Sequence, residues 1–555
     1  MLSWLKRRAQ SSTRAEADTP VANAAVEDAP SVLESARACA ARGEASQAEA
    51  FARKAIAIRH DYADAHLLLG GLCYARGDRE EAIDCLLLAS CFGSNDPEPR
   101  LQLGLLYSET GHTAEAEKIL REGLLLAPDH ARLHNALGAA LFEQERLEEA
   151  KAHFEKAVAL DPMLATAHSN LGYLLFRNFE RFAEGEAHVR KALEIAPGDL
   201  DALTNLSSML PDRPHEVIEV ADRLLQRDPS LDTVRLNRAL SLLKLGDFER
   251  GWRDYEARKS TRCNYQPRSM PWPEWRGENL AGRGIYIHSE QGLGDEIMFA
   301  SCLPEVIASA GRCVIECSPK LRKTFERSFA AKVVVKPLDD ATVAAMAGEG
   351  IDCYSALGSL PRFLRATKAA FSEHHGYLKA DPARIAYWRA RLDALPGRLK
   401  VGMAWRGGTP STRRSVRSTQ LEQWAPLLTL PGVDFIDLQH FDCADERRAI
   451  CSGGTASLHR WPDAHEEYDE TAALVAALDL VVSVQTAVVH LAGALGKEAW
   501  ALLPESPEWR YQQSGSAMPW YPSVKLVRTP PGGTWDGVIA GLAPQLAARF
   551  SRREA

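Results

Sequence analysis

The sequence predicts two architectures in one chain: a superhelix of paired α-helices in the first half and an α/β region with two doubly wound lobes in the second. Two observations lead to this prediction. Small residues recur in steps of 34 between Ala36 and Gly172, and after residue 282 short apolar runs alternate with helical patterns. A chain of 555 residues is also too long for one ordinary core, so several folding units are expected.

Three series of residues carry the repeat. They are the small residues Ala36, Gly70, Gly104, Gly138 and Gly172, a second small series at Ala48, Ala82, Ala116 and Ala150, and the prolines Pro128, Pro162 and Pro197. Small side chains let two antiparallel helices pack closely, and proline ends the second helix because it lacks an N–H donor and clashes with the preceding turn. One pair cannot bury its apolar face alone, so the pairs are expected to stack.

These units resemble tetratricopeptide repeats, as in LHNALGAALFEQERLEEAKAHFEKAVALDP (133–162), and the resemblance covers about residues 31–260. The fifth unit has one inserted residue, which moves its small position to Gly185. The last unit carries Gly251, Trp252, Tyr255 and Glu256, and this aromatic enrichment predicts that it docks on the next domain. We expect the concave face of the repeats to bind a protein or an extended peptide. The alternative is a spacer or a dimerisation surface.

The second half is expected to form two lobes. Residues 261–282, rich in proline and tryptophan, are interpreted as a linker before an N-terminal lobe at 283–397 and a C-terminal lobe at 398–555. The predicted strands are residues 285–288, 313–317, 332–336, 401–405, 434–438, 480–484 and 499–503. Short buried strands that alternate with helices form parallel sheets covered on both faces, and such sheets bind ligands at the carboxyl ends of their strands.

Composition narrows the classes of function. A net charge of −8 argues against nucleic acid as the main partner. No apolar run reaches the about 18 residues that a transmembrane helix needs, and residues 1–30 are expected to be a disordered leader. The 11 cysteines include no C-x-x-C pair, which favours reduced thiols in a cytoplasmic protein.

The first chemical motif is HSEQGLGDE (288–296), directly after the first predicted strand of the N-terminal lobe. Gly292 and Gly294 permit a tight turn and a close approach of a ligand to the backbone. Asp295 then stands at a predicted helix start, where a carboxylate is favoured as the anion and could act as a general base on an acceptor hydroxyl. A plain N-cap aspartate is the alternative, and Glu290 and Glu296 compete for the role of base.

The second motif is SVQTAVVHLAGALG (483–496), in which a strand ends and a helix of small residues begins after Gln485. The free amides and the dipole of that helix favour a diphosphate near Thr486 and Ala487, and Thr486 can cap the helix. His490 lies one turn further on the same face, where it could reach a phosphate or a sugar; a structural histidine is the alternative.

The third motif joins Trp405-Arg406-Gly407-Gly408 to Arg413, Arg414 and Arg417. It follows the first predicted strand of the C-terminal lobe and is interpreted as a phosphate clamp; a solvated basic loop is the alternative. Because no D-x-D motif occurs in the second half, we expect a metal-independent reaction with no bound cofactor.

The second half resembles heptosyltransferase-like glycosyltransferases of the GT-B fold, in the form fused to tetratricopeptide repeats. The matching stretches are SEQGLGD (289–295), VGMAWRGG (401–408), DETAALVAALDLVVSVQTAVVHLAGALGKEAWALLP (469–504), PEWRY (507–511) and PWYPSVKLVR (519–528). The resemblance implies that Asp295 is the base, that Thr486, Ala487 and His490 bind the donor phosphates, and that Arg406 is the basic donor-binding residue. Trp405 belongs to the same donor-binding stretch. The family usually has aspartate where this chain has Gln485, which argues against heptose and could suit an acidic sugar.

The expected function is therefore transfer of a sugar from a nucleotide-sugar to an acceptor hydroxyl, by direct displacement. The resemblance implies a protein acceptor held by the repeats, such as flagellin. Two alternatives remain open: transfer onto lipopolysaccharide or another glycan, and a non-catalytic repeat scaffold with an inactive transferase domain.

Overall fold

The computed structural model describes residues 28–261, 268–335, 343, 350–371, 373–408, 413–440, 443–452 and 457–551. It consists of two compact units, Met1–Ala167 and His168–Ala555, so the division falls inside the repeats. The leader expected at 1–30 lies almost entirely outside the described residues. Its last residues begin helix α2 (Ala29–Ala41), which Asp28 caps by accepting a hydrogen bond from Ser31 N at 2.9 Å.

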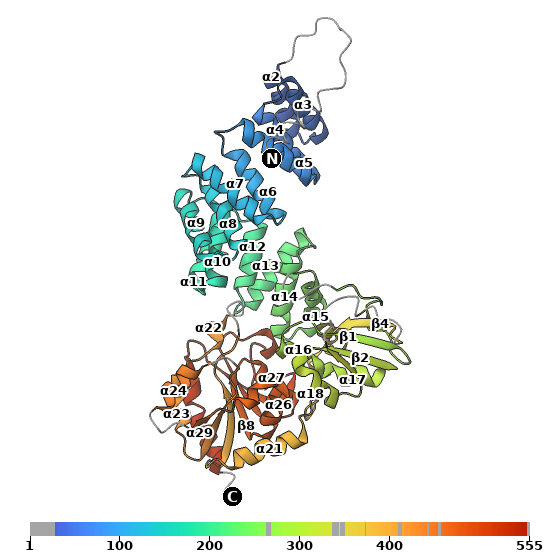
Figure 1. Ribbon diagram of the computed structural model, residues 1–555, viewed down its shortest axis with the longest axis vertical. Coiled ribbons are helices and arrows are strands. Elements are labelled where there is room, and N and C mark those ends of the chain that lie inside the picture. Colours follow the sequence, from blue (N-terminus) through green and yellow to red (C-terminus); the bar gives the residue numbers. More distant parts are fainter. Residues whose placement is uncertain are drawn as a thin grey trace. The chain divides into compact units, whose positions relative to one another are not determined.

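The first unit is a series of antiparallel helix pairs (Figure 1). After α2 come α3 (Ala45–Ile58), α4 (Ala63–Arg76), α5 (Arg79–Phe92), α6 (Glu98–Glu109), α7 (Thr113–Leu126), α8 (Ala131–Glu143) and α9 (Leu147–Leu160). The recurring small residues lie where the two helices of a pair meet. A Cβ added to Gly104 would lie 2.4 Å from Cγ of Leu120, and one added to Gly138 would lie 2.7 Å from the ring of Phe154. The 34-residue series therefore marks close helix contacts, as the sequence predicts.

The second unit begins with further helix pairs. They are α10 (Ala165–Asn178), α11 (Phe182–Ile195), α12 (Leu200–Met209), α13 (Pro214–Arg227), α14 (Asp232–Leu245), α15 (Phe248–Tyr255) and the short 3-10 helix η1 (Glu256–Lys259). A Cβ on Gly172 would lie 2.6 Å from the carbonyl oxygen of Gly185, so the shifted small position of the fifth repeat serves the same packing.

The N-terminal lobe contains a parallel sheet of four strands in the order β3-β2-β1-β4. The strands are β1 (Gly284–His288), β2 (Arg312–Cys317), β3 (Lys332–Val335) and β4 (Cys353–Ala356), and the helices between them include α16 (Leu293–Phe299), α17 (Leu303–Ser309) and α18 (Arg322–Ser328). Residue 336, the expected end of the third strand, lies outside the described residues. The linker adds to this lobe, because Trp275 N donates to the carbonyl oxygen of Tyr354 at 2.7 Å.

The C-terminal lobe contains a seven-stranded sheet in the order β10-β11-β9-β8-β5-β6-β7. Its strands are β5 (Leu399–Ala404), β6 (Val433–Asp437), β7 (Leu458–His459), β8 (Leu480–Val484), β9 (Ala499–Leu503), β10 (Ala517–Met518) and β11 (Tyr521–Arg528). Only β10 pairs antiparallel with its neighbour. The helices include α21 (Pro382–Asp393), η8 (Leu421–Trp424), α23 (Ala425–Leu428), α24 (Ala444–Cys451), α26 (Tyr468–Ala477), α27 (Ala487–Ala494), α28 (Trp535–Ala540) and α29 (Ala543–Ser551). The fold is thus an α-solenoid followed by two α/β lobes.

One hydrophobic core joins the last repeat helices to both lobes. Trp252 of α15 is fully buried in it, donates its indole N–H to the carbonyl oxygen of Arg365 at 2.9 Å, and meets Phe299, Trp509 and Trp520 edge to face. The last repeat therefore docks on the α/β lobes, as its aromatic residues predict. Among the described residues, none of the helices combines the length and the apolar character that crossing a bilayer requires.

Candidate active site

A cavity of about 730 Å³ lies at the carboxyl ends of the strands of both lobes. Its walls come from the segments that follow β1, β5, β6, β8 and β9, and from α14, α15 and η1 of the last repeats. Parallel sheets present backbone and side-chain groups to ligands at this edge. The cavity therefore lies where the first motif (288–296) and the second motif (483–496) are expected to bind a ligand.

The cavity brings together most of the residues that the sequence singles out. Those that line it are Gly292, Gly294, Asp295, Arg406, Gln485, Thr486, Ala487 and His490. Trp405 does not line it. Its side chain is fully buried among Leu399, Val401 and Met403, because residue 405 continues the alternation of β5 into the second core. The Trp405 indole donates to Glu446 at 2.9 Å, so this residue anchors the loop and does not face the cavity.

Asp295 lies in the first turn of α16, whose N-cap is Gly292, so the alternative of a plain N-cap aspartate is wrong. Its Oδ1 accepts a hydrogen bond from Nη2 of Arg510 at 2.7 Å. Burial raises the pKa of the Asp295 carboxyl, and the nearby Arg510 guanidinium acts against that rise. A partly buried carboxylate with a raised pKa suits a general base.

The two competing carboxylates have structural partners. Glu290 is buried and accepts two hydrogen bonds from Arg258 of η1, at 3.0 and 2.6 Å, and one from Gly358 N at 2.8 Å. Glu296 is also buried and accepts from Ser318 N at 2.7 Å. Neither lines the cavity, so Asp295 is the candidate base that faces it.

The start of α27 forms the opposite wall. Thr486 is its N-cap and accepts a hydrogen bond from Val488 N at 3.3 Å, as its position predicts. The first backbone N–H groups of a helix have no partner within the helix, so this end attracts anions. Gly294 of α16 packs against it, since a Cβ there would lie 3.2 Å from the His490 ring and 3.6 Å from Ala487 Cα. The two motifs, from different lobes, are therefore in direct contact.

Gln485 combines burial with unused hydrogen-bonding capacity. Only 1% of the residue is exposed, and within the described part of the chain neither its side-chain oxygen nor its side-chain nitrogen has a hydrogen-bond partner. A buried amide without partners costs about 1–3 kcal/mol. Since Gln485 lines the cavity, a polar ligand could satisfy both atoms.

Besides Lys320 and Arg258, which is paired with Glu290, three arginines of the C-terminal lobe supply positive charge to the cavity. Arg406 pairs with Glu446 and donates to Gln420 at 3.2 Å. Arg417 donates to Glu508 and to the carbonyl oxygen of Gln485, both at 2.9 Å. Arg510 pairs with Asp295, as described above. Of the other basic residues of the third motif, Arg413 lines a neighbouring cavity and Arg414 lines neither.

His490 is buried between two tyrosines. Its Nδ1 lies 3.2 Å from the hydroxyl of Tyr521 and its Nε2 lies 3.5 Å from that of Tyr511. Burial, with the charges of Arg510 and Arg417, holds the pKa of His490 well below its ordinary value. His490 is therefore neutral and can contribute a hydrogen bond but no charge.

Several cavity residues are missing from the sequence-based set. Arg510 and Tyr511 lie in PEWRY (507–511), a stretch that matches the family but to which the sequence analysis assigns no role. Tyr255 and Arg258 come from the last repeat, and Tyr255 donates its hydroxyl to Gln291 at 3.0 Å. The aromatic enrichment near residue 255 predicts that the last repeat docks on the next domain, but it does not predict that Tyr255 lines the cavity.

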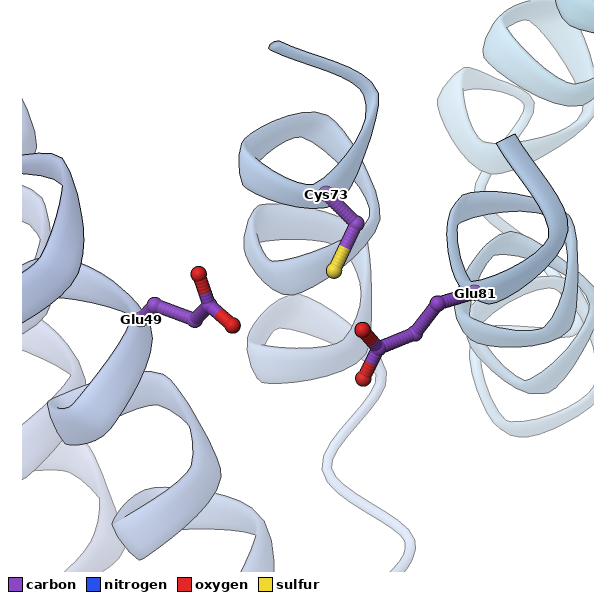
Figure 2. A group of neighbouring side chains, drawn as sticks. All are labelled: Glu49, Cys73 and Glu81. Carbon is purple, nitrogen blue, oxygen red and sulfur yellow. The ribbon is translucent and has the colours of Figure 1, made fainter. Parts of the chain in front are cut away.

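A separate group in the first unit contains potential metal ligands. Glu49, Cys73 and Glu81 point toward one another from α3, α4 and α5, with ligand atoms within 4.8 Å of each other (Figure 2). Arg76 donates to Glu49 at 2.6 Å and to Glu81 at 2.7 Å, and Arg53 pairs with both carboxylates. Burial raises the pKa of the Cys73 thiol to about 11, which keeps it protonated. The two arginines compensate the two carboxylates, so the group is an ion-pair cluster between repeats.

Fold and cavity define a class: a helical-repeat protein that carries a two-lobed α/β region with a charged ligand cavity. Residues 97–130 match the model of the tetratricopeptide repeat and residues 138–178 match a model described as TPR repeat. The chain is 30% identical over 475 residues to Protein FlbA of Caulobacter vibrioides, which covers 81% of this chain and 73% of FlbA. It belongs to the FlbA family.

More distant similarities concern smaller parts of the chain. Over 102 residues it is 36% identical to Protein O-mannosyl-transferase Tmtc1 of Drosophila melanogaster, covering 18% of this chain and 12% of Tmtc1. Among solved structures, a chain of the APC/C hetero-tetramer Cut9-Hcn1 aligns with 43% of this chain and 46% of its own, at 17% identity and a TM-score of 0.36.

Proposed function

We propose that this chain is a glycosyltransferase of the GT-B type that transfers a sugar from a nucleotide-sugar to an acceptor hydroxyl. One observation carries the proposal: Asp295 and the start of α27, with the unpartnered Gln485 amide, line one cavity at the strand ends of two α/β lobes. The cavity unites a base with an anion-binding helix end, which are the two groups that direct displacement needs.

In this reaction the acceptor oxygen attacks the sugar carbon that bears the nucleotide. The new carbon–oxygen bond forms as the bond to the phosphate oxygen breaks, and Asp295 takes the hydroxyl proton. The departing nucleotide carries the negative charge, which the α27 amides, Thr486 and the arginines stabilise. Arg406, Arg417 and Arg510 each hold a carboxylate in the free protein, so a phosphate would exchange with these carboxylates. We propose that the reaction requires no metal.

The identity of the sugar is tied to Gln485. A neutral amide at this position, among three arginines, supports a donor whose sugar carries a carboxylate, because an aspartate here would repel it. Replacement by the family's usual residue tests this. Gln485→Asp should change the preferred donor or lower the rate, and unchanged donor choice with an unchanged rate would refute the role of Gln485.

The proposed acceptor is a protein, such as flagellin, held by the repeats. Support comes from the repeats themselves, since repeat surfaces serve recognition, and from the similarity of part of this chain to Tmtc1, a protein O-mannosyl-transferase. Intact-mass measurement of surface and flagellar proteins, with and without this gene, tests the proposal. A mass shift of one sugar is expected. A truncated glycan with unchanged protein masses would indicate a glycan acceptor instead.

A variant that lacks the repeats must keep those repeat residues that belong to the core of the α/β lobes. Removal of residues 31–260 would delete Trp252, Tyr255 and Arg258, which belong to the core or the cavity. Removal of residues 31–164 leaves them in place. The shortened chain should lose protein modification and retain nucleotide release without acceptor, provided that circular dichroism shows an intact fold. A scaffold without activity should show neither release nor thermal stabilisation by any nucleotide.

A further inference from the structure

A second cavity, of about 240 Å³, lies between the last repeats and the C-terminal lobe. It is far larger than a single water needs. One wall is formed by α12, α13 and α14, and the other by the segments around residues 413–417 and 506–509. We call it the junction cavity. Its lining shares Leu240, Arg417, Gln485, Glu508 and Trp509 with the larger cavity, so the two adjoin at the wall that also approaches Asp295.

The repeat side of the junction cavity offers several neutral polar groups beside the apolar Val217 and Leu240. Ser207 and Ser208 of α12 and Asn237 and Ser241 of α14 line it, and Asn237 donates to Ser207 Oγ at 2.9 Å. Hydroxyl and amide side chains can both donate and accept hydrogen bonds. They suit an extended polypeptide, whose backbone presents one donor and one acceptor for each residue.

Two cations line the same cavity. Lys244 of α14 is buried and donates to the carbonyl oxygen of Pro211 at 2.6 Å and to Ser506 Oγ at 3.1 Å. Burial, together with the neighbouring Arg413, lowers the pKa of Lys244 to about 8. Arg413 lies over the ring of Phe182 at 5.2 Å, and its buried Nε has no hydrogen-bond partner among the described residues.

Three carboxylates, Glu180, Asp212 and Glu508, lie near these cations. Glu508 pairs with Arg417, and Asp212, whose charge acts on both Lys244 and Arg413, is exposed to solvent. The buried Lys244 and the half-buried Arg413, with its unused Nε–H, favour a ligand that brings its own negative charge. Arg413 also has a left-handed backbone, with φ of 58°, which is uncommon outside glycine and is found at binding sites.

We propose that the junction cavity binds the part of the acceptor polypeptide next to the modified hydroxyl, and that Lys244 and Arg413 recognise an acidic side chain of that segment. The inference rests on the proposed function and extends it. The hydroxyl would enter the larger cavity past Gln485 and Trp509, while the flanking residues stay against α12 and α14. The repeats would then select acceptors by charge directly beside the site of transfer.

Direct peptide binding tests the proposal without relying on catalysis. The probes are two fluorescent synthetic peptides, one with a serine flanked by aspartates and one with the same serine flanked by lysines, titrated into the full chain by fluorescence polarisation. The wild type should bind the aspartate peptide about ten-fold more tightly or better, as a desolvated charge pair implies. Lys244→Glu should abolish or reverse this preference, and Ser208→Tyr, which narrows the cavity, should weaken both peptides.

Two further variants keep the result interpretable. Lys191→Glu makes the same charge change at an exposed residue of α11, where Lys191 contacts Glu194, and should retain the preference. Arg413→Gln removes the cation with an unused Nε and should lower the preference even if Lys244→Glu fails to fold. Equal binding of both peptides by the wild type, or an unchanged preference in Lys244→Glu and Arg413→Gln, would overturn the proposal. Nucleotide release without acceptor separates the proposed transferase activity from the proposed peptide binding. If no nucleotide is released but the peptide preference remains, only the transferase activity is refuted.

Discussion

Asp295 of the N-terminal lobe and Arg510 of the C-terminal lobe form an ion pair across the cavity, with 2.7 Å between Oδ1 and Nη2. The pair joins the candidate base to a candidate phosphate ligand, so each neutralises the other in the free protein. A donor phosphate that attracts Arg510 would leave Asp295 without its cation. The Asp295 pKa would then rise, and the carboxylate would become a stronger base at the moment when the donor is in place.

Asp295→Asn should abolish transfer while leaving donor binding intact. An amide cannot accept the hydroxyl proton, and loss of general base catalysis lowers rates about 10²- to 10⁴-fold. Sugar transfer is measured by acceptor mass and donor binding by calorimetry. Asp201→Asn, which changes an exposed residue of α12, is the control and should keep full activity. Transfer by Asp295→Asn at near wild-type rates would show that another group is the base.

Arg510→Met should move the acid limb of the pH profile of kcat/KM to higher pH. In the wild type, burial already raises the pKa of Asp295 and Arg510 holds it down, so removal of the cation lets it rise further. Since the base must be deprotonated, activity would then appear only at higher pH. Arg510→Lys keeps a positive charge and should keep the limb close to its original position. An unchanged limb in Arg510→Met would mean that Asp295 does not govern it.

Gln485→Met should stabilise the free protein and weaken donor binding. Its buried amide lacks partners, so replacement by an apolar side chain of similar length removes a cost of about 1–3 kcal/mol. Urea unfolding reports the stability, and thermal shift with nucleotide-sugars reports the binding. Gln423→Met, whose amide donates to Asp536 at 2.9 Å, should give no gain in stability and no change in binding. A destabilised Gln485→Met with full donor binding would contradict both expectations.

Gly104→Ala should destabilise the first unit, because the added Cβ would lie 2.4 Å from Leu120 in the tight contact between α6 and α7. Overpacking of this kind costs about 1–3 kcal/mol. Gly71→Ala is the matched helical control, since nothing lies within 4 Å of its Cβ position and alanine favours a helix by up to about 1 kcal/mol. Denaturant unfolding of the two variants should therefore give opposite signs.

The sequence predicts those strands best that are buried on both faces. The strands at residues 480–484 and 499–503 have the predicted bounds, because each is a buried apolar run, interrupted only by Ser483 in the first. The two-residue strands β7 and β10 are too short to show a pattern, and β11 contains Pro522 and Lys525 on exposed positions. β4 consists of four residues, CYSA, without a strong β signal.

The sequence predicts those site residues whose place in the fold follows from the strand and helix next to them. Asp295 and Thr486 each follow a strand and open a helix, so the carboxyl-end rule places them at the cavity. The partner of Asp295 lies 215 residues away, and no local pattern reveals such a pair. The family resemblance groups Trp405 with the donor-binding stretch, whereas the two-residue period of β5 directs its indole into the core.

The burial of Trp252 in the core of the α/β lobes has a consequence for how such chains can be recombined. The last repeat behaves as a structural part of the domain that follows it, with Tyr255 and Arg258 completing the wall of the cavity. A chimera in which the repeats are replaced by those of another protein should therefore keep the native helices from α14 onward. Joining foreign repeats directly at residue 261 would open the interior of the lobes to water.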